Sequence, residues 1–164
     1  FPFEITPAVP GEWKWITDSS ADYILEEPLP YGKVYTVHFT GRLIANTGEL
    51  LETPSAQISF TTPHPIINVR PRQEIGWFDD DDVIQITFEI PMDHDSVEKA
   101  LRIQPDVPGV FEWLGNTLRY TPDFSSLPSN DDYFTVLISI ETTALSAAGD
   151  QVFHQPYQLS YWYC

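Results

Sequence analysis

The sequence has one cysteine, few basic residues and no long apolar run. The single Cys164 permits no disulfide within the chain, so the fold must depend on packing alone. No apolar stretch approaches the roughly 20 residues of a membrane-spanning helix, which predicts no membrane insertion. Only 8 basic residues stand against 24 acidic ones, and the net charge is −16. Because such a surface repels phosphate backbones, nucleic acids are excluded as expected partners.

The motifs of common catalytic and metal sites are also missing. The histidines have no His-x-x-x-His spacing, which argues against a zinc site; they are His38, His64, His94 and His154. No Gly-x-Ser-x-Gly turn supports a serine nucleophile, and no glycine-rich loop could cradle a phosphate. The sequence therefore predicts a protein that is not an enzyme and has no organic cofactor.

Aromatic residues and prolines are abundant. The chain has 10 Phe, 8 Tyr, 5 Trp and 15 Pro, and 42% of its residues are apolar, enough for a packed core. Proline is poorly tolerated inside helices but accepted at strand edges and in turns. The composition therefore favours an all-β fold.

Residues 103–113 repeat a pattern that the chain already carries 98 residues earlier, at residues 5–15. Six of the eleven positions are identical: Ile5/Ile103, Pro7/Pro105, Val9/Val107, Pro10/Pro108, Gly11/Gly109 and Trp15/Trp113. Later matches join 35–37 to 134–136, 45–48 to 147–149 and 57–60 to 158–161. Such self-similarity predicts two modules of about 100 residues each. We expect Trp15 and Trp113 to be equivalent core residues.

Alternating apolar residues predict about seven short strands per hundred residues, which is typical of an antiparallel β-sandwich. The strongest strand is expected over residues 83–90, with others over 34–39 and 133–140. Gly115-Asn116 predicts a hairpin turn. The one expected helix covers residues 93–101, with Asp95 as its cap and Glu98 as the capping-box partner.

The two copies differ in what precedes the shared Pro-Val-Pro-Gly turn. About forty residues of the second copy come before it, but only about six of the first. We therefore expect residues 1–62 to be a partial module without its leading strands, and residues 63–164 to be a complete one. Thr62-Pro63-His64-Pro65 predicts a short, stiff linker. Upstream residues of a longer parent, or a neighbouring chain, are expected to complete the first module.

Several motifs of the second copy follow one another in an order that has a known counterpart. They are residues 88–93 (Phe-Glu-Ile-Pro-Met-Asp), 96–97, 101–105, 108–109, 111–113, 116–118 and 120–122. Together they resemble the bacterial Ig-like domain of surface-layer proteins. The resemblance implies tandem Ig-like antiparallel β-sandwiches, the first incomplete, with one short helix near 95–101. It also implies a non-catalytic spacer or adhesion module of a secreted or cell-surface bacterial protein.

Arrays of the same domain occur in bacterial alpha-macroglobulin-like proteins. Their Pro-Ala-Val-Pro-Gly-Glu-Trp sequence motif is similar to residues 7–13. A segment of such a protease inhibitor is therefore the first alternative function. Nothing in the sequence resembles that family's Cys-Gly-Glu-Gln thioester, so no covalent trapping is expected of this chain.

Two acidic clusters are candidate calcium sites, because Ca²⁺ takes six to eight oxygen ligands. Neither cluster has the Asp-x-Asp-x-Asp-Gly pattern of a calcium loop, and consecutive carboxylates point in alternating directions. The competing interpretations are a solvated turn for the first cluster, and backbone and helix capping for the second. The candidate ligands are Asp79, Asp80, Asp81, Asp82, Asp93 and Asp95.

The expected partners are other domains of the parent protein and a protein or glycan ligand. Tryptophans exposed in a row would stack on sugars; the candidates are Trp13, Trp15, Trp113 and Trp162. A calcium- or carbohydrate-binding accessory module is therefore the second alternative function.

Overall fold

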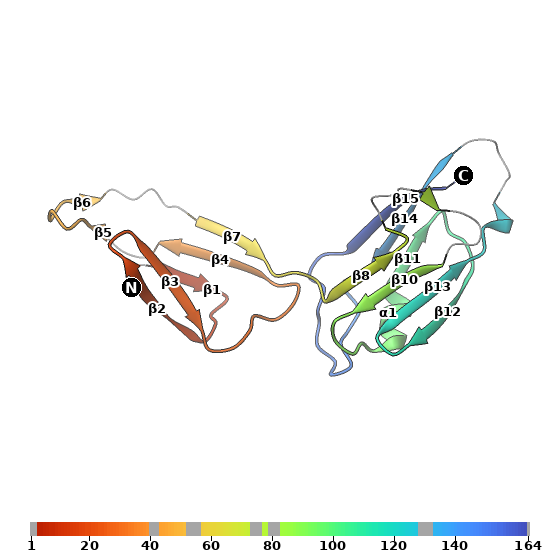
Figure 1. The fold of residues 1–164 in the computed structure, drawn as a ribbon, viewed down its shortest axis with the longest axis horizontal. Coiled ribbons are helices and arrows are strands. Elements are labelled where there is room, and N and C mark those ends of the chain that lie inside the picture. The colour runs from red at the N-terminus through yellow and green to blue at the C-terminus, as the bar shows by residue number, and fades with distance from the viewer. Residues whose placement is uncertain are drawn as a thin grey trace. The chain divides into compact units, whose positions relative to one another are not determined.

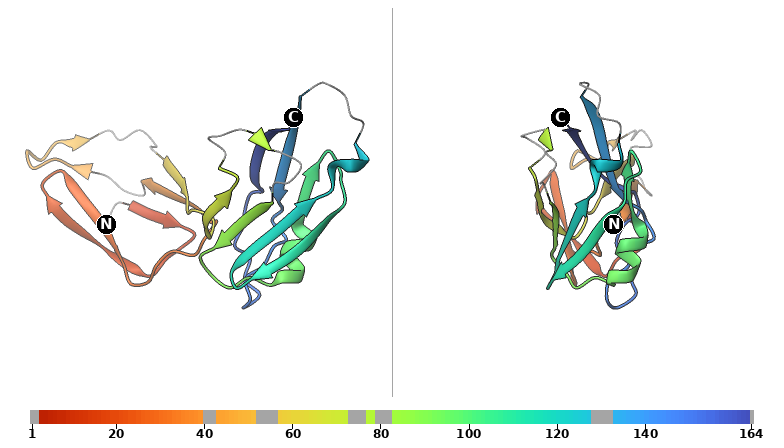
Figure 2. Two further views of the ribbon diagram at one scale, coloured as in Figure 1. Left: turned by 45° about the vertical axis from the view of Figure 1, so that its right-hand side comes forward. Right: turned by 90° about the vertical axis from the view of Figure 1, so that its right-hand side faces the viewer.

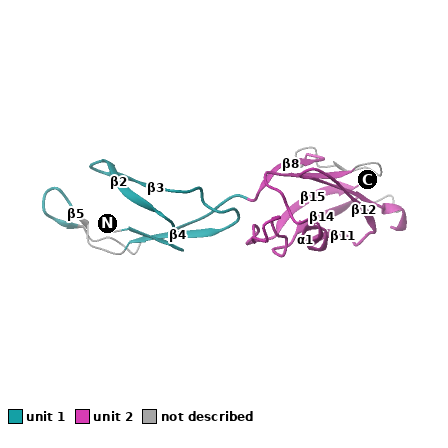
Figure 3. Cartoon of the chain, turned by 90° about the horizontal axis from the view of Figure 1, so that it is seen from below, with its two compact units in different colours: residues 1–63 teal, residues 64–164 magenta. Residues whose placement is uncertain are grey.

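The chain is mostly β-strand and divides into two compact units, unit 1 (residues 1–63) and unit 2 (residues 64–164), coloured separately in Figure 3. The structure is a computed structural model that describes residues 3–39, 43–51, 57–72, 77–78, 83–127 and 133–163. Its several antiparallel sheets and one short α-helix confirm the predicted all-β, sandwich-like fold class. Within the described ranges, no helix is long and apolar enough to cross a membrane.

Unit 2 consists of two four-stranded sheets, which Figures 1 and 2 show as two layers. The first sheet has the order β12 (Gly109–Leu114), β13 (Thr117–Pro122), β10 (Ile84–Phe88), β8 (Ile66–Arg70). The second has the order β11 (Leu101–Gln104), β14 (Phe134–Ile140), β15 (Tyr157–Tyr163), β9 (Trp77–Phe78). Neighbouring strands are antiparallel, except that β9 pairs with β15 in parallel.

The core of unit 2 follows from the two-residue period of its strands. In β10, Ile84, Ile86 and Phe88 are buried, whereas the polar residues between them are partly exposed. Leu159 and Tyr161 of β15 form a buried row in the second sheet. Helix α1 (His94–Ala100) adds buried apolar residues on one face, and a short 3-10 helix, η1 (Phe124–Ser126), follows β13. The apolar rows of both sheets thus form one core.

Unit 1 has smaller sheets. Its strands are β1 (Phe3–Thr6), β2 (Gly11–Thr17), β3 (Ser20–Leu25), β4 (Val34–Phe39), β5 (Leu43–Ile44), β6 (Leu50–Leu51) and β7 (Gln57–Thr61). They form a three-stranded sheet, β1-β4-β7, and two pairs, β2-β3 and β5-β6. Among the described residues of unit 1, Tyr35 is the one large apolar side chain that is fully buried. Unit 1 therefore has a much thinner core than unit 2.

The strand pairings of the two units correspond. In unit 1, Val37 lies opposite Ile5 on one side and Ile58 on the other. In unit 2, Ile138 lies opposite Ile103 and Leu159 in the same way. The sheet β1-β4-β7 therefore has the order of β11-β14-β15, and the pair β2-β3 has the order of β12-β13.

These registers correct one of the sequence matches. Tyr35 was predicted to correspond to Phe134, but the pairings align it with Val136, two residues further on. Because the shift is an even number of residues, each side chain stays on the same face of the sheet. The alternation of apolar and polar residues therefore could not reveal the shift.

A turn in each unit also has the same geometry. The N–H of Gly48 donates to the carbonyl of Ala45 at 2.8 Å, and that of Gly149 donates to Ser146 at 2.8 Å. Both glycines have positive φ, 84° and 87°, a conformation in which a side chain would be strained. This turn therefore requires glycine in both units.

Candidate functional site

The first predicted metal cluster, Asp79 to Asp82, lies outside the described residues. The second consists of Asp93 and Asp95, which the structure places at the start of α1. In the part of the chain that the structure describes, no group of three or more His, Cys, Asp or Glu side chains could hold a metal ion.

Asp93, not Asp95, caps helix α1. Its Oδ1 accepts from the Ser96 N–H at 2.8 Å, and its carbonyl accepts from the Ser96 hydroxyl at 2.9 Å. The Ser96 Oγ in turn accepts from the N–H of Leu145 at 2.9 Å. The predicted cap at Asp95 was therefore wrong, and Asp95 is an exposed residue of the first turn. The tertiary bond to Leu145 fixes Ser96 as the third helical residue.

The predicted capping-box partner has a different role. Glu98 accepts a hydrogen bond from the indole N–H of Trp113 at 2.9 Å. The His94 ring stacks on the same indole at 3.8 Å between centroids, with an angle of 4°. Phe88 stacks on it at 6.0 Å between centroids, with an angle of 24° between the rings. Trp113 is thus held between strand β10 and helix α1.

Trp15 occupies the matching position of β2 but is 50% exposed. The prediction that Trp15 and Trp113 are equivalent core residues was therefore wrong, since Trp15 is exposed and Trp113 is only half-buried. The physical reason is that Phe88 and α1, which cover Trp113, belong to segments with no counterpart among the described residues of unit 1. The alternating pattern placed both tryptophans on the correct face of the strand. Whether that face is buried depends on the segments that pack against it.

Two other histidines have local partners. His38 Nε2 lies 3.5 Å from a carboxylate oxygen of Glu4. His64 stacks on Phe153 at 4.9 Å and meets the edge of Tyr157 at 5.4 Å. Burial lowers the pKa of His64, so this ring is neutral at pH 7. These contacts give His64 a packing role in unit 2.

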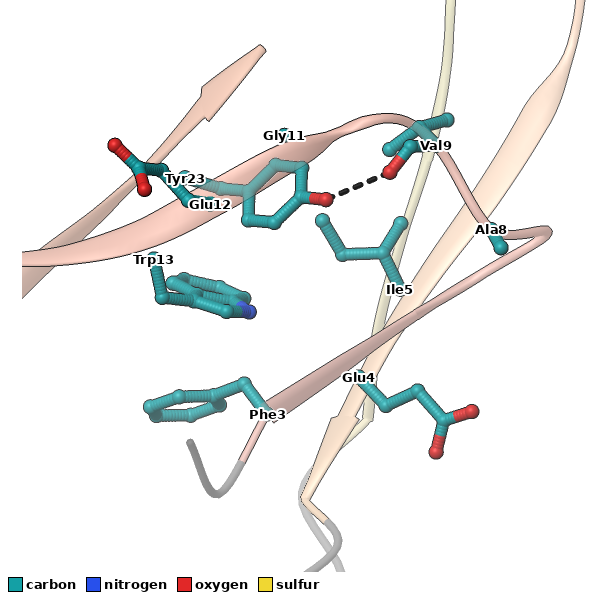
Figure 4. Close-up of a pocket in the computed structure, with 9 residues that line it drawn as sticks. All are labelled: Phe3, Glu4, Ile5, Ala8, Val9, Gly11, Glu12, Trp13 and Tyr23. Carbon is teal, nitrogen blue, oxygen red and sulfur yellow. Dashed lines mark hydrogen bonds between the residues drawn. The ribbon is translucent and has the colours of Figure 1, made fainter. Parts of the chain in front are cut away.

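Unit 1 has a hollow of about 390 Å³ between β1 and the β2-β3 pair, shown in Figure 4. In the figure, the rings of Phe3 and Trp13 lie one above the other, with the ring of Tyr23 beside them. Trp13 is 5.1 Å from each of the other two ring centroids. The Tyr23 hydroxyl donates to the carbonyl of Val9 at 2.6 Å. The carboxylates of Glu4 and Glu12 point away from the rings.

Unit 2 has a hollow of about 580 Å³ at the corresponding place, between β11 and the β12-β13 pair. The Tyr120 hydroxyl donates to the carbonyl of Val107 at 3.2 Å, and the Phe111 ring packs on Tyr120 at 4.8 Å. Burial, and then the negative charge of Asp106, raise the pKa of Tyr120. Tyrosine and valine thus form the same bond in both hollows.

A glycine under each tyrosine ring makes this contact possible. A Cβ on Gly11 would lie 2.7 Å from Cε1 of Tyr23, and one on Gly109 would overlap the ring of Tyr120. The sequence comparison found both glycines but missed the tyrosines. The β2-β3 hairpin has one more residue than β12-β13, with a register shift between Trp15 and Thr17, so the tyrosines do not share the fixed offset. A comparison that allowed one insertion would have found them.

The two hollows therefore share their packing contacts, whereas the charged residues at their rims differ. Glu4 and Ala8 of the first hollow correspond to Arg102 and Asp106 of the second. The recurrence indicates a feature of the fold rather than a ligand site common to both units.

The chain matches no protein-family model and no curated protein. The resemblance to the Ig-like domain of surface-layer proteins consequently depends on the sequence motifs alone.

Proposed function

We propose that this chain is a non-catalytic spacer or interaction segment of a larger secreted or surface-displayed bacterial protein, built from one partial and one complete Ig-like module. The observation that carries the proposal is the correspondence of strand pairings between the units, together with the repeated tyrosine–valine bond. The contacts that recur in both units are packing contacts, which are expected of a module selected for shape and stability.

The path of the chain through unit 2 also supports a spacer. The first strand of unit 2 is β8 and its last described strand is β15, and Figure 1 shows the start of β8 and the end of β15 at opposite ends of the unit. Modules whose ends lie apart in this way extend an array when they are joined in series. The proposed role is therefore to hold other parts of the parent at a distance.

Stretching single molecules of the chain tests this proposal. We expect separate unfolding events, with unit 2 lengthening the tether by roughly 300 Å, since an extended residue spans at most about 3.6 Å. A Phe88→Ala variant should unfold unit 2 at a lower force and leave the unfolding force of unit 1 unchanged, because Phe88 belongs to the buried core of unit 2. Unfolding of the whole chain in one step, unchanged by Phe88→Ala, would contradict two mechanically independent modules.

A thermal melt with and without calcium tests the ion-binding alternative. A ligand that binds only the folded state raises Tm in proportion to RT ln(1 + [L]/Kd). The spacer proposal expects no shift. A rise of several degrees, lost when Asp79 to Asp82 are replaced by Asn, would favour a calcium-binding module instead.

Glycan binding is the second candidate, and the aromatic lining of the unit 1 hollow favours it. Trp13 and Phe3 lie at the hollow, and aromatic faces are the surfaces on which sugars stack. This candidate expects binding on a glycan array that Trp13→Ala abolishes while the fold stays intact. If the unsubstituted chain bound no glycan, the spacer would remain the proposed function.

A further inference from the structure

Strand β12 of unit 2 has an open edge. It lies at the end of the first sheet, beside β13, with which it pairs along its whole length (Figure 1). Among the described residues, no other strand pairs with it. The edge belongs to unit 2, at the opposite end of the sheet from β8, so it does not depend on what completes unit 1. An open strand edge presents backbone donors and acceptors that can pair with another chain.

The other edge strands of unit 2 are irregular, short or partly covered. The pairing of β8 with β10 has a register shift between Thr87 and Phe88. β11 has four residues, and the Arg102 guanidinium donates to the carbonyl of Leu101 within it at 3.0 Å. The described part of β9 has two residues. β12 has six residues and no register shift, so it is the longest regular edge in the described part of unit 2.

The matching edge of unit 1 has features that protect edge strands, and β12 lacks them. Glu12 of β2 stands where β12 has Val110, and Lys14 stands where β12 has Glu112. The β2-β3 pairing also has a register shift. Charged side chains, lysine above all, and bulges keep edge strands from pairing. In β12, by contrast, Val110 and Leu114 are 70% and 58% exposed.

The inner side of β12 borders the hollow of about 580 Å³ between β11 and the β12-β13 pair. Phe111 of β12 lines this hollow. Directly opposite residues of neighbouring strands lie on the same face of a sheet. A strand added to β12 would therefore direct the side chain opposite Phe111 toward the hollow.

Acidic residues outnumber basic ones around this hollow. Its lining includes Glu98, Asp106 and Glu141, and Arg102 is the one basic lining residue. In the described part of the chain, none of these three carboxylates has an ion-pair partner, and the Arg102 guanidinium donates to backbone carbonyls. A basic side chain that entered the hollow would meet complementary charge.

We propose that unit 2 binds an extended, basic segment of another polypeptide, which adds to β12 as an antiparallel strand and directs a basic side chain into the hollow. The inference deepens the interaction role in the proposed function and names the partner of unit 2. Addition of a strand to a sheet edge gives affinity through main-chain hydrogen bonds and specificity through alternate side chains.

The hairpin determines which backbone groups of β12 are available. Leu114 and Thr117 flank a two-residue turn and form the first hydrogen-bonded pair of the ladder. In an antiparallel ladder every second pair is hydrogen-bonded in this way. The N–H and C=O groups of Phe111 and Trp113 therefore point away from β13, toward the added strand.

The side chains of β12 predict the pattern of the bound strand. Opposite Val110 and Leu114, on the outer face, it should carry apolar residues. Opposite Phe111 it should carry lysine or arginine, which faces the carboxylates of the hollow. Glu112 is already paired with Arg119 at 3.0 Å, so an uncharged polar residue suits the position opposite it.

A second copy of this chain does not fit that pattern. Antiparallel pairing of two β12 strands centred on Glu112 would place like charges directly opposite each other, which weakens a strand pair. β12 has no lysine or arginine to offer the hollow. Two chains at −16 each also repel one another.

An NMR titration of the full chain with two peptides of equal composition tests the proposal. Listed from the residue opposite Leu114 to the one opposite Val110, the probe is Val-Thr-Thr-Lys-Ile. The control, Val-Thr-Thr-Ile-Lys, exchanges the last two residues. We expect the probe to bind saturably and tighter than the control by about threefold or more. The amide exchange of Phe111 and Trp113 should slow, and that of β2 should not change.

A lysine placed on the edge should prevent binding. Val110→Lys removes an apolar contact and repels the basic probe, so we expect affinity to fall by about fivefold or more. Thr121→Lys is the matched control, because Thr121 is exposed and lies opposite Val110 on β13, away from the edge. It should change affinity less than about twofold, since a neighbouring strand separates it from the peptide.

Neutral variants of the hollow test the charge selection. In the unsubstituted chain, the probe should bind about two- to fivefold tighter than the same peptide with glutamine in place of lysine. The double variant Asp106→Asn/Glu98→Gln should bind the two peptides equally. Glutamine at position 98 keeps an oxygen that can accept from the Trp113 indole, so the packing of β12 on α1 is retained.

Several outcomes would overturn the proposal. They are failure of the probe to bind, equal binding of the control peptide, and unchanged affinity in the Val110→Lys chain. Concentration-dependent protection of Phe111 and Trp113 without peptide would also overturn it, by assigning the edge to a second copy. Separate unfolding events in the stretching experiment would persist in each case, so failure here is distinguishable from failure of the proposed function.

Discussion

The replacement of Gly109 by alanine tests whether the tyrosine ring under the hairpin holds unit 2 together. The added Cβ would overlap the ring of Tyr120. That ring is buried and its hydroxyl is bonded to Val107, so it cannot move aside without losing the bond. We therefore expect Gly109→Ala to destabilise unit 2 and leave unit 1 unchanged.

The magnitude follows from three contributions. Overpacking of a buried site costs roughly 1–3 kcal/mol. Loss of the tyrosine–valine bond adds about 1 kcal/mol. Alanine lowers the conformational entropy of the unfolded chain relative to glycine, which offsets about 0.4–1 kcal/mol of this loss in stability. The expected loss is about 2 kcal/mol, or roughly a 30-fold fall in the ratio of folded to unfolded unit 2.

Hydrogen exchange read by mass spectrometry separates the two units, because peptides from residues 101–122 and 134–163 report on unit 2 alone. The matched control is the double variant Gly109→Ala/Tyr120→Leu, in which the shorter side chain leaves room for the Cβ. A double-mutant cycle should show coupling of 0.5 kcal/mol or more. Additive costs, or a Gly109→Ala chain as protected as the parent, would refute the packing argument.

Two further predictions concern unit 2. Asp93→Ala removes the cap of α1 and should cost about 1 kcal/mol, whereas Asp95→Ala should stay within about 0.5 kcal/mol; a larger loss at Asp95 in urea denaturation would contradict the cap assignment. Burial, with a smaller contribution from Tyr157, raises the pKa of Tyr161 to about 12. The unfolded chain releases that proton near pH 10, so stability should fall as pH rises from 10 to 12, by about 2–3 kcal/mol. In denaturation series over this range, Tyr161→Phe should flatten the curve, and an equally steep curve would show that another group is responsible.

The sequence predicted individual strands well because alternation is a local property. The strand expected over residues 34–39 has those bounds in the structure. The strand expected over residues 83–90 is shorter, since Glu89 bends away and its N–H donates to the carbonyl of Pro65 at 2.9 Å. That bond comes from a distant segment, which no local pattern contains.

The helix cap shows where local rules become ambiguous. Asp93 and Asp95 stand two residues apart, and each is followed three residues later by a side chain that could complete a cap, Ser96 or Glu98. Tertiary contacts decide between them, because Glu98 accepts a hydrogen bond from the indole of Trp113 and the Ser96 hydroxyl accepts one from the N–H of Leu145. The aromatic hollow was missed for a related reason, since a one-residue insertion hid the matching tyrosines.

The β-strands, the turns that require glycine, the short helix and the repeated residues can all be recognised in the sequence, since each depends on neighbours along the chain. The register of strands β4 and β14, the residue that caps the helix and the burial of the repeated tryptophan depend on contacts between segments that are distant in the sequence. These depend on the surface that lies opposite, which for Trp113 is β10 and α1. Two identical residues in matching strands therefore differ in burial, because a side chain leaves water only where another surface covers it.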